Sequence, residues 1–258
     1  MKNIFNNSKY HVLIPAAGKS TRLAHLTRNK PKAFIDIAGK SLIEYSLDLL
    51  HSFGFTKATF VLGYMKDYFI KNLGKKYKDI DLSYVYTDNW EATGHGYGLF
   101  LTKKELEKEN RDVILMDADG FFDKILLEKL LLSPFENVVV VDSSPKSNNE
   151  EEIVLGKDGI VKRFVRGIHK KEVESVGEFV GINKFSSGFI RKTFDYMDEF
   201  FKNNGPMIKY ERIFDDMILK KGEKINYIDS AGTFWINMNN EMEYNKLKKW
   251  ILNNPIKL

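Results

Sequence analysis

Residues 10–32 read YHVLIPAAGKSTRLAHLTRNKPK, and this stretch decides how the chain is expected to fold. It begins with the apolar run Val12-Leu13-Ile14 and continues into the small-residue turn Pro15-Ala16-Ala17-Gly18. Two cations, Arg22 and Lys32, follow ten residues apart. An apolar strand that leads into a glycine turn and a basic loop presents backbone N–H groups and cations to phosphate. The stretch therefore predicts a binding site for a nucleoside triphosphate.

The composition is that of an ordinary globular protein. The 258 residues are 43% hydrophobic and 29% charged, and the net charge is +5. The basic excess is local, between Lys19 and Lys40, with Phe34 as the one Phe, Tyr or Trp in that segment, which favours a phosphate site over a nucleic acid polymer. Cysteine is absent, the N-terminus has no signal-peptide core, and no apolar run approaches transmembrane length. We therefore expect a cytoplasmic protein that does not enter a membrane.

The first half alternates strand and helix patterns. Strands are expected at residues 12–14, 34–37, 56–62, 82–86 and 112–116, and helices at 42–54, 65–73 and 99–106. The glycine-rich residues 87–98 are expected to be irregular. This alternation predicts a three-layer α/β/α sheet fold that binds its ligand at the carboxyl ends of the strands.

The second half predicts a different arrangement. Its strands are expected at residues 138–141, 153–155, 159–165, 178–185 and 224–228, and its helices at 187–201, 208–220 and 241–252. We expect one domain over residues 1–258 with no appended module. Residues 1–142 would bind the nucleotide, and residues 143–258 would build the acceptor site and supply a second metal ligand.

Two common nucleotide motifs do not fit. Gly18-Lys19-Ser20 looks like the end of a P-loop, but the position that needs the earlier glycine is Leu13. No G-x-G-x-x-G pattern follows the first strand, so a dinucleotide-binding fold has no support.

Another family does match. Ala16-Ala17-Gly18, Thr21-Arg22-Leu23 and Pro31-Lys32 resemble the signature of nucleotidyltransferases that activate phosphorylated small molecules. Landmarks resembling this family continue in the same order to the end of the chain: residues 39–45, 93–96, 118–119, 178–182 and 235–239. The resemblance implies a Rossmann-like mixed sheet of the GT-A-like nucleotidyltransferase type.

The resemblance also implies a reaction and its residues. A phosphate monoester oxygen would attack the α-phosphorus of the nucleoside triphosphate and release pyrophosphate, which requires positioning and charge neutralisation. Arg22 and Lys32 would be the catalytic cations, and Mg²⁺ would be the cofactor, held by Asp119 and Asn239. Asp117 is a rival for Asp119, and Asn237 is a rival for Asn239. The nucleotide would contact Ala16, Ala17, Gly18, Lys19, Ser20, Thr21, Thr93, Gly94 and His95.

The acceptor and the base are less sharply defined. Glu178, Arg166 and Tyr210 are the candidate acceptor residues. Tyr210-Glu211 and Asp215-Asp216 could line the acceptor pocket, or they could equally form a solvated acidic face of their predicted helix. A choline-type acceptor would need an aromatic cage, for which Trp90, Tyr97, Phe121, Phe122 and Tyr210 are candidates.

Ala118-Asp119 and residues 178–182 resemble the corresponding segments of cytidylyltransferases more than those of the glucose-phosphate enzymes. The favoured hypothesis is therefore CMP transfer from CTP to a phosphocholine-like or sugar phosphate. Uridylyl, guanylyl or thymidylyl transfer to a sugar 1-phosphate is the alternative, and a non-catalytic nucleotide-binding regulator is another. The second half would allow a homodimer.

Overall fold

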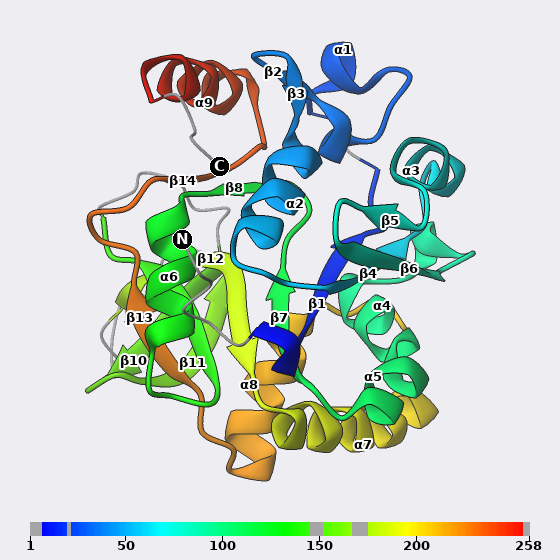
Figure 1. Ribbon diagram of the computed structural model, residues 1–258. Helices are drawn as coiled ribbons and strands as arrows, with labels where there is room; N and C mark the ends of the chain where they lie inside the picture. Colours follow the sequence, from blue (N-terminus) through cyan, green and yellow to red (C-terminus); the bar gives the residue numbers. More distant parts are fainter. Residues whose placement is uncertain (1–6, 20–21, 145–151, 167–174, 255–258) are drawn as a thin grey trace.

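The carboxyl ends of four neighbouring parallel strands form one edge of a ten-stranded sheet, ordered β10-β11-β13-β9-β12-β7-β1-β4-β6-β5 (Figure 1). This computed structural model describes residues 7–19, 22–144, 152–166 and 175–254. Strands β7, β1, β4 and β6 run parallel, and β12 is antiparallel to both β7 and β9. The predicted three-layer, Rossmann-like mixed-sheet fold is confirmed.

The strands of this sheet are β1 (Tyr10–Ala16), β4 (Lys57–Leu62), β5 (Lys76–Tyr77), β6 (Ile80–Tyr86), β7 (Asp112–Met116), β9 (Val138–Asp142), β10 (Glu152–Lys157), β11 (Ile160–Arg166), β12 (Ser175–Phe185) and β13 (Asn226–Asp229). Two small ribbons are added, β2 (Asp36–Ile37) with β3 (Lys40–Ser41) and β8 (Gly120–Phe122) with β14 (Trp235–Asn237).

The α-helices are α1 (Ala24–Thr27), α2 (Leu42–Ser52), α3 (Lys66–Leu73), α4 (His95–Leu101), α5 (Lys103–Glu109), α6 (Lys124–Leu132), α7 (Ser187–Asn203), α8 (Tyr210–Lys221) and α9 (Glu241–Asn253). Short 3₁₀ turns lie at Asn7–Lys9, Lys32–Phe34 and Trp90–Ala92.

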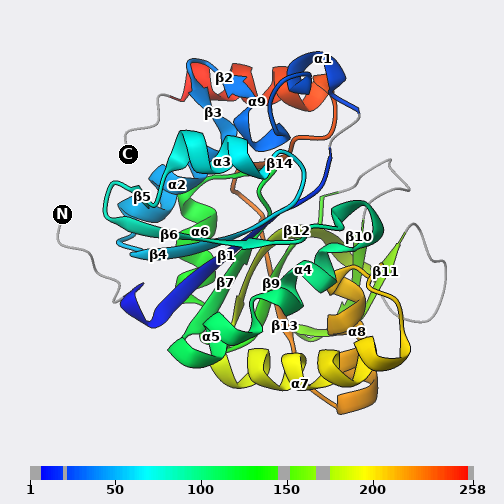
Figure 2. The same ribbon diagram turned by 90° about the vertical axis from the view of Figure 1, so that its right-hand side faces the viewer.

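Strand β1 is the centre of the fold. Val12, Leu13 and Ile14 are fully buried, which is expected for an apolar run between two parallel neighbours. Val12 and Ile14 face a core that includes α2, α3 and α6, whereas Leu13 faces a core that includes α4, α5, α7 and α8. Figure 2 shows these two groups of helices on opposite sides of the sheet. The alternation of side chains along one strand thus explains the three layers.

A third apolar cluster covers the carboxyl edge of the sheet. It joins Ile37 of β2, Leu42 of α2, Phe121 of β8, Ile236 of β14 and Leu247 of α9. Helix α9 lies above β14 and close to the β2–β3 ribbon in Figure 1. This cluster fixes the β8–β14 ribbon, which flanks the site described below.

Several local predictions are correct. Ser41 is the N-cap of α2, and Glu44 Oε2 accepts a hydrogen bond from the Ser41 N–H at 2.9 Å, so the helix begins with a capping box. Strand β7 has the predicted bounds, and β4, β6, α3, α7, α8 and α9 lie within a few residues of theirs.

Two local predictions are wrong, and one helix has no counterpart among the predictions. Residues 34–37 hold the end of a 3₁₀ turn and the two-residue β2 rather than one strand. Helix α6 was not predicted, although Asp123 caps it and accepts from the Ile125 N–H. The predicted helix at 99–106 is two helices, and the first, α4, begins inside the stretch expected to be irregular. Among the described residues, no helix is both long enough and apolar enough to span a membrane.

Candidate active site

A cavity of about 510 Å³ opens at the carboxyl ends of β1, β4, β6 and β7. Its lining includes Ala16 at the end of β1, Val61 near the end of β4, Thr87 after β6 and Asp117 after β7. The strand order reverses at β1, because β4 and β6 lie on one side of it and β7 on the other. Such a reversal is where open α/β sheets bind ligands.

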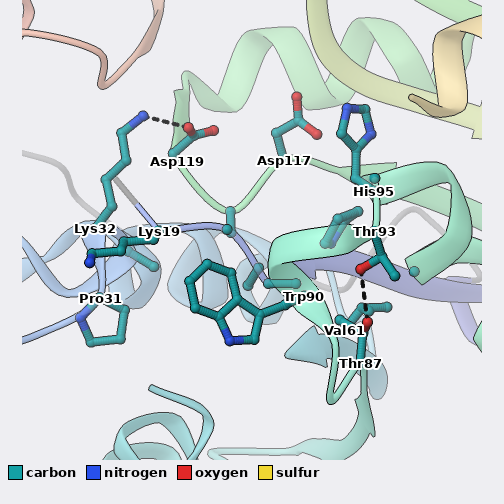
Figure 3. Close-up of a pocket in the computed structure, with 18 of the residues that line it drawn as sticks. Lys19, Pro31, Lys32, Val61, Thr87, Trp90, Thr93, His95, Asp117 and Asp119 are labelled. Carbon is teal, nitrogen blue, oxygen red and sulfur yellow. Dashed lines mark hydrogen bonds and ion pairs between the residues drawn. The ribbon is translucent and has the colours of Figure 1, made fainter. Parts of the chain in front are cut away.

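Most predicted site residues meet at this cavity. The lining contains Ala16, Ala17, Gly18, Lys19, Arg22, Lys32, Thr93, Gly94, His95, Asp119, Asn239 and Tyr210. Figure 3 shows Lys32 with Asp119 in one part of the cavity and Asp117 beside His95 in another. Ser20 and Thr21, also predicted to bind the nucleotide, lie outside the described residues.

Lys32 joins the two predicted metal ligands. Its Nζ donates to Asp119 Oδ2 at 2.6 Å and to Asn239 Oδ1 at 3.2 Å. Arg22 Nη2 donates to the same Asn239 oxygen at 3.2 Å. Side chains from the first loop, from the end of β7 and from the segment after β14 therefore converge on one point.

The β8–β14 ribbon explains why Asp119 and Asn239 meet. The two strands are antiparallel with Gly120 opposite Asn237, and the Met238 N–H donates to the Asp119 carbonyl at 2.9 Å. A Cβ at position 120 would lie 2.3 Å from the Phe122 ring, so the close turn after Asp119 requires glycine.

The oxygen pair of Asp119 and Asn239 fits magnesium in its chemistry. Carboxylate and amide oxygens are hard ligands, and both already contact a single cation, the Lys32 ammonium. No group of three or more His, Cys, Asp or Glu side chains in the described part of the chain is arranged to hold a metal. A protein-only cage is not needed, because Mg²⁺ commonly takes one or two carboxylates, substrate phosphate oxygens and water.

The two candidate asparagines differ in position. Asn239 shares the Lys32 ammonium with Asp119. Asn237 also lines the second cavity, but its Oδ1 is buried and has no hydrogen-bond partner among the described residues. The geometry thus favours Asn239 over Asn237 as the partner of Asp119.

Asp117 is held differently from Asp119. The Tyr210 hydroxyl donates to its Oδ1 at 2.8 Å, and its backbone N–H donates to the Gly181 carbonyl at 2.9 Å. Desolvation raises the pKa of Asp117 well above its usual range, and the negative charges of Asp119 and Glu211 act in the same direction. Burial and these neighbouring charges disfavour the ionised form of Asp117, whereas Asp119 is paired with the Lys32 ammonium.

The predicted base-binding loop packs against the segment that precedes α8. The Gly94 N–H donates to the Pro206 carbonyl and the Gly96 N–H to the Ile208 carbonyl, each at 2.9 Å. A Cβ at Gly94 would lie 2.0 Å from the Ile208 oxygen, so only glycine allows this approach. Thr93 Oγ1 lies 3.0 Å from Thr87 Oγ1, which ties the loop to the end of β6.

A second cavity of about 320 Å³ adjoins the first and shares part of its wall, including Arg22, Asp119 and Glu211. Arg166, a predicted acceptor residue, lines this second cavity, whereas Tyr210 lines the first. Glu178 lines neither cavity. It is buried on β12 opposite Asp142, and the neighbouring Phe179 faces the cavity instead, because side chains alternate along a strand.

The candidate aromatic cage does not form. Phe121 packs into the third apolar cluster, with its ring centroid 5.4 Å from that of Trp250. Tyr97 packs against Phe201 at 5.1 Å. Trp90 does line the first cavity, and its ring packs against that of Tyr64 with the centroids 5.4 Å apart.

Sequence reasoning missed several lining residues, namely Val61, Phe69, Thr87 and Gly98 in the first cavity and Glu152, Phe179 and Lys209 in the second. They come from strand ends, from within α3, α4 and β12, and from the residue before α8. The order of the strands, which the sequence does not give, brings these segments together.

A known protein family matches the part of the chain that contains this cavity's first loop and Asp119. Residues 12–159, more than half of the chain, match the MobA-like NTP transferase domain. The chain belongs to this family of nucleotidyltransferases. The matched residues include most of β1, the loop that follows it and Asp119. The match confirms the resemblance seen in the sequence.

Individual relatives differ in what they act on. Over 154 residues the chain is 31% identical to the choline-phosphate cytidylyltransferase of Streptococcus pneumoniae, covering 59% of this chain and 62% of that protein. Over 201 residues it is 25% identical to the CTP:phosphoglutamine cytidylyltransferase of Campylobacter jejuni, covering 73% and 78%. Over 111 residues it is 30% identical to a UTP–glucose-1-phosphate uridylyltransferase of Haloferax volcanii, covering 43% and 44%.

The fold also matches solved structures. The CTP:phosphocholine cytidylyltransferase of Streptococcus pneumoniae superposes with a TM-score of 0.73 at 23% identity, covering 94% of this chain and 99% of that chain. The inositol-1-phosphate CTP transferase of T. maritima has a TM-score of 0.76 at 16% identity, with 96% and 97% covered. At these identities the superpositions establish the NTP transferase fold.

The packing of the predicted base-binding loop, residues 93–96, can be tested with Gly94→Ala. We expect a loss of about 1–3 kcal/mol in the free energy of unfolding, because the added methyl group meets the Ile208 backbone. Gly205→Ala is the control, since a Cβ at that position meets nothing within 4 Å. Urea denaturation measures both variants, and equal midpoints for the two would contradict the close approach.

Proposed function

We propose that this NTP transferase moves CMP from CTP onto a small phosphate monoester and releases pyrophosphate, with Mg²⁺ as cofactor. The observation that carries the proposal is the convergence of Arg22 and Lys32 with Asp119 and Asn239 in one cavity, which the loop after β1 also lines. Two cations and a pair of hard oxygen ligands are what a triphosphate and its metal require.

The reaction needs no covalent intermediate on the protein. An oxygen of the acceptor phosphate forms a bond to the α-phosphorus, and the bond between the α-phosphorus and its bridging oxygen breaks as pyrophosphate leaves. Lys32 and Arg22 would hold the phosphate oxygens on which negative charge grows. Each charged hydrogen bond of this kind contributes about 1.5–3 kcal/mol.

Magnesium would be held by Asp119 and Asn239 and would neutralise charge on the phosphates when bound. Because Asn239 supplies an amide where a carboxylate would add a negative charge, we expect the metal to be bound weakly without substrate. The residues that orient the nucleotide would be Ala16 to Lys19 on one side and Thr93 to His95 on the other.

The choice of CTP is supported by the two cytidylyltransferases among the relatives. The alternative is uridylyl transfer to a sugar 1-phosphate, supported by the glucose-1-phosphate uridylyltransferase of Haloferax volcanii. Pyrophosphate release with each nucleoside triphosphate, paired with phosphocholine, phosphoglutamine or glucose 1-phosphate, tests both. We expect release with CTP. Release confined to UTP would establish the alternative, and nucleotide binding without release would indicate a regulatory protein.

Lys32→Ala tests the catalytic cation. We expect kcat to fall about 10²- to 10³-fold with a much smaller change in KM for the nucleotide, because the ammonium stabilises charge that develops in the transition state. Lys30→Ala, in the same basic segment but outside both cavity linings, is the matched control. A change in KM alone would assign Lys32 to ground-state binding.

Asp119→Asn tests the metal ligand. The substitution keeps the shape and removes the charge, so we expect the Mg²⁺ concentration for half-maximal activity to rise about tenfold or more. Asp79→Asn is the control, since that side chain is 84% exposed beside His51. An unchanged Mg²⁺ dependence, measured at saturating CTP, would remove Asp119 from the metal site.

A further inference from the structure

Glu211 occupies the wall that the two cavities share. It lies in the first turn of α8, and its side chain is only 8% exposed. Its Oε2 is buried and has no hydrogen-bond partner among the described residues. A carboxylate in this position is costly to bury unless a ligand or a neighbour satisfies it.

The nearest side chain does not supply a counter-charge. His95 Nε2 lies 3.6 Å from Glu211 Oε2, beyond hydrogen-bond range. Its Nδ1 accepts the Tyr210 N–H at 3.4 Å, so in the neutral ring the proton sits on Nε2 and points toward the carboxylate. Desolvation lowers the pKa of His95, against the opposing attraction of Glu211, which favours that neutral ring.

The other carboxylates of the second cavity each have a partner. Asp119 is bonded by Lys32. Glu152 accepts from Arg212 Nη2 at 2.9 Å and from Lys209 Nζ at 3.5 Å. Asp117 accepts from the Tyr210 hydroxyl. Glu211 differs from all three, because its side chain lines both cavities while its buried Oε2 has no donor from the described residues.

The same cavity also contains groups that bind phosphate. Arg22 and Arg166 line it together with Glu211. Phe179 adds an aromatic ring to the lining, with its centroid 6.1 Å from that of Tyr210. A ligand that satisfies this wall carries a phosphate at one end and a positive charge at the other.

Building on the proposed function, we propose that the acceptor is a phosphate monoester that bears a positively charged nitrogen, and that Glu211 is the counter-ion that selects it. A hydroxyl group would supply a donor to Oε2 but would leave the negative charge uncompensated. A cationic nitrogen supplies the charge, and the adjacent aromatic rings accept its apolar substituents.

The test compares three acceptors on the full-length enzyme. Phosphocholine carries the charge, 3,3-dimethylbutyl phosphate has the same shape without it, and glucose 1-phosphate offers hydroxyl groups. Calorimetry in the presence of CTP and Ca²⁺, which we expect to slow turnover, measures binding, and pyrophosphate release measures kcat and KM. The variants are Glu211→Gln, Glu211→Asp and the control Glu136→Gln, which removes an exposed carboxylate between α6 and β9.

We expect the wild-type enzyme to favour phosphocholine over its neutral isostere by about 10- to 100-fold in affinity and in kcat/KM. Glu211→Gln should remove most of this preference by raising KM for phosphocholine alone, with kcat and the isostere little changed. Glu211→Asp should retain part of it, and Glu136→Gln all of it. Thermal unfolding of each variant shows whether the fold is intact.

The possible failures are distinguishable. Equal binding of phosphocholine and its isostere, or an unchanged preference in folded Glu211→Gln, would overturn the role of Glu211 even if pyrophosphate is released with glucose 1-phosphate. No release with any acceptor, together with a charge preference in binding that depends on Glu211, would overturn the proposed transfer reaction and leave the recognition standing. If neither pyrophosphate release nor a charge preference is observed, the proposed transfer reaction and the role of Glu211 are both overturned.

Discussion

The site depends on one ammonium group held between two oxygens. Lys32 contacts Asp119, 87 residues away in sequence, and Asn239, 207 residues away. Charged hydrogen bonds of this kind are stronger than neutral ones, and Lys32 is only 14% exposed, so water screens them incompletely. The interaction requires the β8–β14 ribbon to bring the two ligands to one edge, and that ribbon in turn requires the third apolar cluster beneath α9. A polar site is thus positioned by apolar packing on its outer side.

A second constraint joins the predicted base-binding loop, residues 93–96, to α8. Helix α4 has the sequence HGYGLFL, and each glycine in a helix costs about 1 kcal/mol relative to alanine. Glycine is needed at position 96 because the Ile208 carbonyl lies where a side chain would be, and at position 98 because the Val61 side chain does. Tyr210 and Glu211 follow directly, so the loop expected to contact the base and the helix that faces the second cavity form one wall.

The sequence predicted features that have a local cause. The apolar run of β1, its glycine turn and the capping box of α2 are visible in a few residues, and the structure has each of them. Asp119 and Asn239 were identified by resemblance, and the structure brings them together. The errors arise where distant packing decides: α4 forms despite its glycines because Pro206 and Ile208 accept its N–H groups, and Glu178 faces away because the alternation of β12 places Phe179 toward the cavity. The first effect depends on residues more than 100 positions away, and the second depends on which face of β12 is turned to the cavity, which its neighbouring strands decide.

Negative side chains in these cavities would oppose a phosphate ligand unless each has a partner. Asp119 is paired with Lys32 and Glu152 with Arg212, and Asp117 accepts a hydrogen bond from the Tyr210 hydroxyl. Glu211 lies at the amino end of α8, where the helix dipole favours negative charge, but the dipole supplies no donor to its buried Oε2. If Glu211 is the counter-ion proposed above, its negative charge would repel the phosphate of an acceptor, and that phosphate would lie toward Arg22 and Arg166. The distribution of charge in the wall would then orient a bound molecule as well as attract it.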